Sequence, residues 1–179
     1  MTETSISTLP QSKLSQFIFQ NKHLSWLWLV VRVYVGWQWF HAGWTKLYNP
    51  AWVGDQAGTA VKGFLLGALQ KSSGPHPDVQ GWYAAFIQNF ALEHTVFFSY
   101  LVTYGELLVG AALIVGMCTA TAAFFGAFMN MNYLLAGTVS INPILLVLEI
   151  LLMLAWRTAG WIGLDRYILH KLYAPAERL

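Results

Sequence analysis

Apolar residues gather into four long runs along the chain, separated by short polar stretches or by one long connection. The runs lie at about Leu24 to Leu47, Val96 to Met117, Thr119 to Ser140 and Pro143 to Leu164. Each is close to the twenty or so residues that an α-helix needs to cross the hydrocarbon core of a membrane. None shows the polar face that a helix of a soluble bundle turns toward water, so the pattern predicts four transmembrane helices.

The segments between the runs predict how these helices connect. Residues 116–119 and 140–143 form joints so short that the helices on either side must be antiparallel neighbours, and Pro143 suits the start of a helix. Residues 48–95 form a long connection with two amphipathic stretches, Ala60 to Leu69 and Gly81 to Leu92, which are too short to span. We expect both stretches to lie at the membrane surface as a cap.

The predicted fold is therefore all-α: an integral membrane four-helix bundle with a long, partly helical extracytoplasmic loop between helices 1 and 2. We expect one domain over residues 1–179. Composition agrees, because only 10% of residues are charged and 56% are hydrophobic, with a mean hydropathy of +0.49. A soluble chain of this length could not keep so much apolar surface out of water.

Charge and cysteine content exclude other classes of protein. The net charge of +2, without a run of lysine or arginine, gives no reason to expect a nucleic-acid partner. A single cysteine, Cys118, excludes an intrachain disulfide or a redox-active thiol pair. No CxxC, HExxH or phosphate-binding glycine loop is present, and no metal site is predicted.

The distribution of basic residues predicts the orientation in the membrane. With four spans, both termini and the joint at 116–119 share one side, and the stretch before Leu24 is polar and holds no span. That side carries Lys13, Lys22, Arg166, Lys171 and Arg178, whereas the long connection balances Lys62 and Lys71 with Asp55, Asp78 and Glu93. We expect a multi-pass protein of the cell (plasma) membrane with both termini in the cytoplasm.

Ionisable residues inside a membrane span are costly, and they therefore point to function. The predicted helices contain Arg32, His41, Glu106, Glu149 and Arg157, with Lys46 at a boundary. At 100° per residue, each helix collects small and polar residues on one face. The four faces are Arg32, Gly36, Trp39, Gly43 and Lys46; Ser99, Glu106, Gly110 and Met117; Ala123, Gly126, Asn130 and Gly137; and Asn142, Glu149, Trp156 and Gly160. We expect these faces to turn inward and form one polar seam.

Depth along the helices suggests which charges meet. A rise of about 1.5 Å per residue places Arg32 about 12 Å and Glu106 about 16 Å from the predicted cytoplasmic edge. We therefore expect an inner group of Arg32, Glu106 and Arg157, and an outer group of Glu149 and Lys46. Such pairs could merely fix helix register, but five charges exceed what a small bundle needs for folding, which favours a function.

Histidine offers a weaker candidate. His41 points away from the Arg32 face, and a histidine at an aromatic-rich helix end is more often interfacial than a proton carrier or ligand. A haem held by His41 and His94 is an alternative, since haem can take two axial ligands, but no other feature supports it.

One set of motifs is similar to a known family. Arg32, Gly36, Gly43 and Lys46-Leu47, followed by Asn49-Pro50-Ala51-Trp52, resemble the first-helix signature of the DoxX/DoxD family. Gly105-Glu106 with Gly110, the asparagines of the third helix and the segment Gly160 to Asp165 extend the resemblance over nearly the whole chain. The aromatic insert from Trp52 to Phe90 resembles the DoxD branch, the larger membrane subunit of thiosulfate:quinone oxidoreductase.

The resemblance implies electron transfer from thiosulfate, with formation of tetrathionate, into membrane quinone. Glu106 and Glu149 would then transfer protons, while Arg32 and Lys46 would polarise the quinone carbonyls or attract an anion. Candidates for contact with the quinone are Trp39, Asn130, Trp156 and His41. Expected partners are membrane lipid, quinone and a DoxA-like second subunit, and the chain could also form homo-oligomers.

Two other functions stay open at this point. The chain could be a non-catalytic membrane scaffold that recruits redox enzymes, with purely structural charges. It could also be a small proton-linked transporter that uses the same polar seam. Copurifying partners would favour the scaffold, and uptake of substrate into liposomes without a redox change would favour the transporter.

Overall fold

A computed structural model describes residues 12–167, and every regular element among them is helical, which confirms the all-α class. The elements in chain order are α1 (Lys13–Gln20), the 3₁₀-helix η1 (Lys22–Leu24), α2 (Ser25–Leu47), α3 (Thr59–Gln70), α4 (Gly81–Phe86), the π-helix η2 (Ile87–Ala91), α5 (Thr95–Val115), α6 (Thr119–Leu135) and α7 (Asn142–Leu154).

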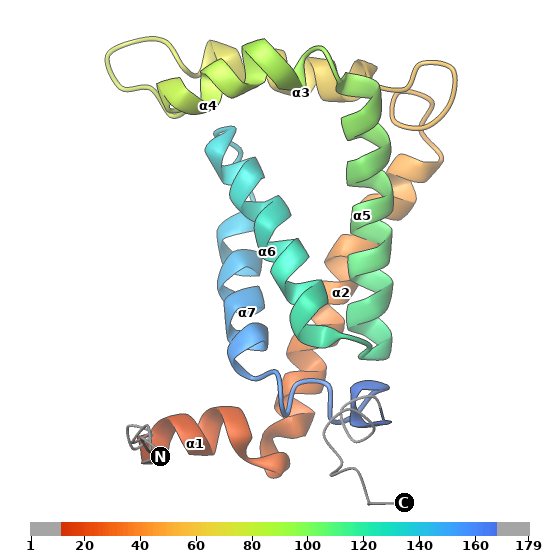
Figure 1. Cartoon of the computed structure of the whole chain (residues 1–179), viewed down its shortest axis with the longest axis vertical. Coiled ribbons are helices and arrows are strands. Elements are labelled where there is room, and N and C mark those ends of the chain that lie inside the picture. Colours follow the sequence, from red (N-terminus) through yellow and green to blue (C-terminus); the bar gives the residue numbers. More distant parts are fainter. Residues whose placement is uncertain (1–11, 168–179) are drawn as a thin grey trace, which may run out of the picture.

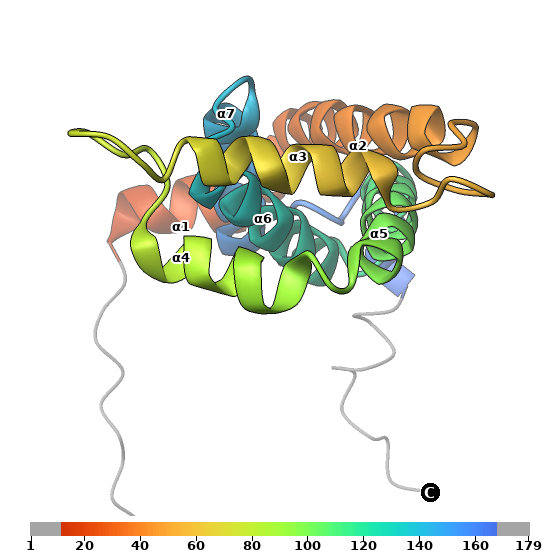
Figure 2. The same ribbon diagram turned by 90° about the horizontal axis from the view of Figure 1, so that it is seen from above.

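Four helices, α2, α5, α6 and α7, run along the long axis of the molecule (Figure 1). The helices α3 and α4 lie across one end, which we call the cap end, and α1 lies across the opposite end, which we call the α1 end. Seen from above, α3 and α4 run beside each other over the bundle (Figure 2). The two helical stretches expected in the long connection are thus confirmed as helices that cover one end of the bundle.

The bundle consists of two closely packed pairs, α2 with α5 and α6 with α7. Glycine lets α2 and α5 approach, because a Cβ atom on Gly110 would lie 2.3 Å from the backbone nitrogen of Phe40. Gly36 faces the same contact, since its Cβ would lie 3.0 Å from the carbonyl oxygen of Gly110. Small residues have this role in membrane helix pairs, and here they occupy the face that the sequence predicted.

Two apolar clusters hold the molecule together. The first lies inside the bundle and includes Val35, Val109, Leu113, Ala123 and Leu152. The second joins the cap to the bundle and includes Val61, Leu65, Tyr83, Ile87 and Ala136. Within the cap end, the Tyr83 hydroxyl donates to the main-chain oxygen of Asn132 at 3.2 Å, and the Lys71 ammonium donates to the Gly137 carbonyl at 2.7 Å. The cap is therefore bound to the end of α6 by both apolar and polar contacts.

The joint between α5 and α6 is the tight antiparallel turn that the sequence predicted. Gly116 adopts a left-handed conformation with φ of +70°, and Cys118 follows with φ of +50°. A side chain on Gly116 would also collide with Arg32, whose Nη1 would lie 1.3 Å from the added Cβ. Both the turn and the neighbouring arginine therefore require glycine at this position.

The predicted ends of the third and fourth helices were wrong. Helix α6 ends at Leu135 instead of Ser140, and α7 ends at Leu154 instead of Leu164. After Leu154 the chain continues in turns, where the Thr158 hydroxyl bonds to the carbonyl oxygens of Phe19 and Ala155 at 2.9 and 3.2 Å. In this turn the amides of Thr158 and Ala159 both bond to the Ala155 carbonyl, at 2.8 and 2.7 Å.

An additional helix, α1, lies before the first predicted span. Its first turn is capped by Ser12, whose hydroxyl oxygen accepts from the Ser15 amide at 3.1 Å. Trp28 of α2 secures α1 to the bundle by donating from Nε1 to the Ile18 carbonyl at 3.1 Å. The polar composition of this stretch concealed the helix, which is amphipathic and stabilised by its contact with the bundle.

By length and composition, one helix of the described part is a candidate membrane span, α5 (Thr95–Val115). Helix α7 is apolar but shorter, and α2 carries more polar residues. The four-span topology and its orientation therefore stay predictions. Of the basic residues that predicted the orientation, Lys171 and Arg178 lie outside the described residues, whereas Lys13, Lys22 and Arg166 are exposed.

Candidate functional site

A buried ion pair joins α2 to α5. Glu106 of α5 is 1% exposed, and its Oε2 lies 2.7 Å from the Nζ of Lys46, whose side chain is 19% exposed. Lys46 starts near the end of α2, but helical side chains lean toward the N-terminus of their own helix, so its ammonium group reaches back into the bundle. The Lys46 Nζ also lies 5.0 Å from the ring centroid of Trp52, a cation–π distance.

A tyrosine from α6 completes the surroundings of Glu106. The Tyr133 hydroxyl donates to Glu106 Oε1 at 2.8 Å, so each carboxylate oxygen has a different partner. The ring of Tyr133 meets Phe64 of α3 edge to face, with 6.0 Å between centroids. Glu106 is thus held by residues from α2 and α6 and lies below the cap.

The second carboxylate, Glu149 of α7, is fully buried and is held by neutral donors. Trp39 of α2 donates from Nε1 to Glu149 Oε1 at 2.5 Å, and Asn130 of α6 donates from Nδ2 to Oε2 at 2.6 Å. Gly126 of α6 makes room for this group, because a Cβ there would lie 2.4 Å from Glu149 Oε1. No lysine or arginine among residues 12–167 forms an ion pair with Glu149. The two carboxylates therefore differ, since only Glu106 has a cation in contact.

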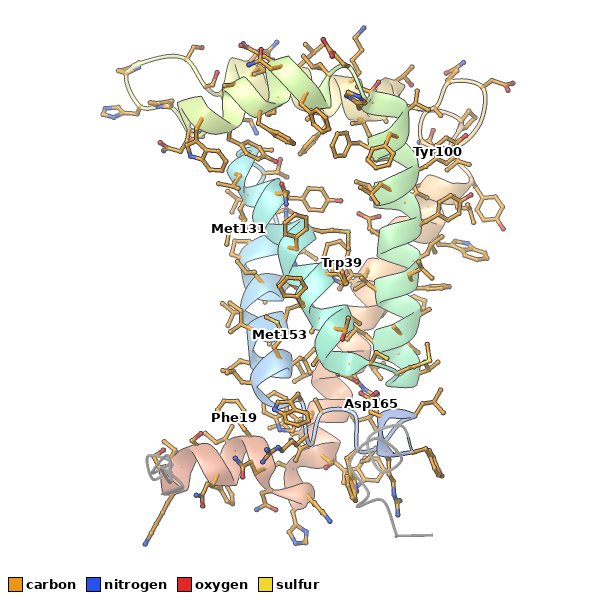
Figure 3. All side chains as sticks on the ribbon, in the orientation of Figure 1. Phe19, Trp39, Tyr100, Met131, Met153 and Asp165 are labelled. Carbon is orange, nitrogen blue, oxygen red and sulfur yellow. The ribbon has the colours of Figure 1, made fainter. Side chains whose placement is uncertain are left out.

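Aromatic rings connect the two carboxylates. The rings of Trp39 and Tyr133 have centroids 6.3 Å apart and planes inclined by 31°. Trp39 lies inside the bundle, well away from both ends (Figure 3). We call the set of Lys46, Glu106, Tyr133, Trp39, Glu149 and Asn130 the two-carboxylate site. The Tyr133 and Trp39 rings lie between its two acids, Glu106 and Glu149. The Lys46 ammonium contacts Glu106, and the Asn130 amide contacts Glu149.

Arg32 lies elsewhere, at the α1 end of the bundle. It is 1% exposed, and its Nη2 donates to the Ile162 carbonyl at 2.7 Å. The negative charge of Asp165 attracts the Arg32 guanidinium. The Asp165 carboxylate accepts from the amides of Cys118 and Thr119 at 2.6 and 2.9 Å, and so caps the start of α6. Arg32 and Asp165 thus fasten the last described turn of the chain to the joint between α5 and α6.

The predicted pairing of charges was wrong. Glu106 pairs with Lys46 and not with Arg32, and Glu149 has neutral partners instead of Lys46. Arg157 belongs to neither group, because it is exposed and lies over the Trp156 ring at 4.8 Å. Depth estimated from helix rise does not include the length of a lysine side chain or its direction toward the N-terminus of the helix. Arg157 lies beyond the end of α7 at Leu154, so the estimate did not apply to it.

Of the four residues predicted to contact a quinone, the structure brings two together. Trp39 and Asn130 both contact Glu149. Trp156 lies apart, near α1, and His41 is exposed beside Trp37, with 6.0 Å between ring centroids. Of the predicted catalytic residues, Lys46, Glu106 and Glu149 belong to the two-carboxylate site, and Arg32 does not.

Sequence reasoning missed the parts played by Tyr133 and Asp165 in the bundle. Tyr133 lies three positions after Asn130 and therefore close to its face of α6, so helical periodicity could have found it. Asp165 lies beyond the end of α7 and caps α6, which is distant in the sequence. The residues around Asp165 therefore show no pattern that would predict this contact.

Comparison with known proteins gives one match. Residues 27–140 match the sequence model of the DoxX family. This range includes α2 to α6, and hence every member of the two-carboxylate site except Glu149. No curated protein and no solved structure matches the chain significantly.

Proposed function

We propose a function for this chain, which belongs to the DoxX family of membrane proteins. It is an oxidoreductase subunit that passes electrons from thiosulfate, or a related sulfur compound, to a membrane quinone. In this proposal α2, α5, α6 and α7 form the membrane bundle, with the cap outside and both termini in the cytoplasm. The observation that carries the proposal is the two-carboxylate site, in which Glu106 and Glu149 are buried on either side of the Trp39 and Tyr133 rings.

The chemistry of quinone reduction matches two buried acids. Oxidation of two thiosulfate ions to tetrathionate releases two electrons, and reduction of one quinone to quinol takes up two electrons and two protons. A buried site needs its own groups to supply those protons. Glu149, whose partners are neutral, supplies one proton. Glu106, ionised beside Lys46, receives the second proton from the Lys46 ammonium and passes it to the quinone oxygen, while the Tyr133 hydroxyl holds the carboxylate at Oε1.

The polar groups present also fit the oxygens of a quinone ring. The Lys46 ammonium is a donor for a carbonyl oxygen, and it is the one cation in contact with the site among the described residues. The Oδ1 atom of Asn130 is buried without a hydrogen-bond partner in the described structure, and it can accept from a quinol hydroxyl. Trp39 and Tyr133 supply flat apolar surfaces of the kind that line sites for ring-shaped ligands.

Access to the site requires movement, because Glu106, Glu149 and Asn130 are at most 1% exposed. Helices α5 and α6 meet at their short joint and diverge toward the cap (Figure 1), and Tyr133 and Phe64 pack between α6 and α3. The quinone ring enters from the bilayer between α5 and α6, displacing Phe64. A DoxA-like second subunit at the cap end brings the sulfur donor.

One observation supports a second candidate, a non-catalytic scaffold. One buried charge has an ion-pair partner within the described residues, Glu106 with Lys46, and Asp165 interacts electrostatically with Arg32, as expected of structural charges. Glu149 is the exception, since a structural role gives no reason to bury an acid among neutral donors only. This residue therefore distinguishes the two candidates.

The test is thiosulfate-dependent reduction of a soluble quinone analogue by the purified chain, alone and in native membranes. We expect Glu149→Gln and Glu106→Gln to lower the rate by about 100-fold each, the size of a lost general acid. Glu93→Gln is the matched control, because Glu93 is exposed at the cap end. Full activity in both buried variants would refute the proposal, and copurified redox enzymes without any activity would favour the scaffold.

A further inference from the structure

The two ends of the molecule carry different charges. At the α1 end the exposed charged side chains within residues 12–167 are all basic: Lys13, Lys22, Arg157 and Arg166. The acid at that end, Asp165, is 4% exposed and already caps α6. At the cap end, by contrast, exposed acids accompany the lysines: Asp55, Asp78 and Glu93 with Lys62 and Lys71. A surface of one sign attracts a partner of the opposite sign.

A groove lies at this end of the molecule, between α1 and the end of α7. Its lining comprises Ser15, Phe19 and Gln20 from α1 and Leu154, Trp156 and Arg157 from the other side. The Arg157 guanidinium lies over the Trp156 ring at 4.8 Å, which orients it and leaves its edge available for a ligand.

An apolar track continues from the groove along α7. Leu154, Ile150 and Val147 are 55%, 43% and 56% exposed, and their spacing of three and four residues places them on one face of the helix. On the other side of the groove, Leu14 and Phe17 of α1 are also exposed. Helix α1 crosses the end of the bundle at a steep angle to the four long helices (Figure 1), as expected of an amphipathic helix in the plane of a membrane interface.

We propose that this groove binds one anionic phospholipid, with the phosphate on Arg157 and an acyl chain along Leu154, Ile150 and Val147. Arginine suits the phosphate because its planar guanidinium can donate two parallel hydrogen bonds. The hydroxyl of Ser15 is a further donor to the headgroup. The apolar track requires a lipid and gives no site for free phosphate, and the basic surroundings select an anionic headgroup over a zwitterionic one.

The test is native mass spectrometry of the full chain released from nanodiscs that contain phosphatidylglycerol, phosphatidylcholine or both. We expect the chain to retain phosphatidylglycerol in preference to phosphatidylcholine, and Arg157→Gln to weaken that retention by about five- to tenfold. Arg157→Lys keeps the charge and should retain most of the binding. Lys62→Gln is the matched control, because Lys62 is an exposed basic residue at the cap end.

A second variant keeps the test valid if Arg157→Gln fails to fold. Ser15→Trp fills the groove from the side of α1 without changing any charge, and it should abolish the preference for phosphatidylglycerol at unchanged thermal stability. Equal retention of both lipids by the wild-type chain would overturn the proposal. So would wild-type retention in both Arg157→Gln and Ser15→Trp, or displacement of the lipid by millimolar inorganic phosphate.

Discussion

From the close contact between α2 and α5 we predict that Gly110→Ala lowers the free energy of unfolding. A Cβ atom added to Gly110 would lie 2.3 Å from the backbone nitrogen of Phe40, 2.6 Å from its Cα and 2.7 Å from its Cβ. Because these are mostly backbone atoms, no side-chain rotation can relieve the clash. The two helices must instead move apart by about 1 Å to restore an ordinary contact of about 3.5 Å.

Two effects of opposite sign determine the magnitude. Alanine favours a helix over glycine by about 1 kcal/mol, which stabilises the variant. Overpacking a tight contact costs about 1–3 kcal/mol, and separating the helices also weakens dispersion contacts along the shared core, including Val35, Val109 and Leu113. We therefore expect a net loss of about 1 kcal/mol in the free energy of unfolding.

The assay is unfolding of the purified chain in mild detergent by titration with a denaturing detergent, followed by helical circular dichroism. Gly63→Ala is the matched control, because Gly63 lies within α3 and a Cβ there would meet nothing within 4 Å. This control should gain up to about 1 kcal/mol from helix propensity alone. Equal stabilisation in both variants would refute the close approach of α2 and α5 at Gly110.

Two further predictions concern the ends of the molecule. Asp165→Ala removes the cap of α6 and a negative charge that acts on buried Arg32, so it should cost about 2 kcal/mol of unfolding free energy. An unchanged unfolding midpoint would contradict this role of Asp165. In the cap, burial raises the pKa of Tyr83 above its usual 10.0, so its contribution to stability is complete below about pH 10 and is lost as pH rises through the raised pKa. Proteolysis of the connection at residues 71–80 should accelerate in that alkaline range for the wild type, and Tyr83→Phe should remove the pH step; a step of the same size in the variant would count against this role.

Helical periodicity predicted much of the bundle interior. The face of α2 that contains Arg32, Gly36, Trp39 and Gly43 is buried in the structure, as the sequence indicated. This succeeds because residues three, four and seven apart share a face whatever the partner helices are. Small and polar residues on one such face of a membrane helix identify the contact surface without any knowledge of the fold.

Periodicity could not predict which polar residues meet. The Lys46–Glu106 pair depends on the lean of a long side chain, and the contact of Glu149 with Trp39 and Asn130 depends on how α6 and α7 are placed against α2. The turn after α7 is fastened by Thr158, whose hydroxyl bonds to α1, a helix far away in the sequence. These features arise from tertiary contacts, which leave no repeating pattern in one segment.

If the two-carboxylate site holds a quinone, solvent extraction and absorbance should detect that quinone in the purified protein. Protein purified in mild detergent from quinone-containing membranes should carry about one quinone per chain, since such a buried site takes a single ring. Glu93→Gln should carry the same amount, whereas Glu149→Gln and Glu106→Gln should carry much less. Wild-type protein without quinone, or equal quinone in all four proteins, would show that the two-carboxylate site does not bind it.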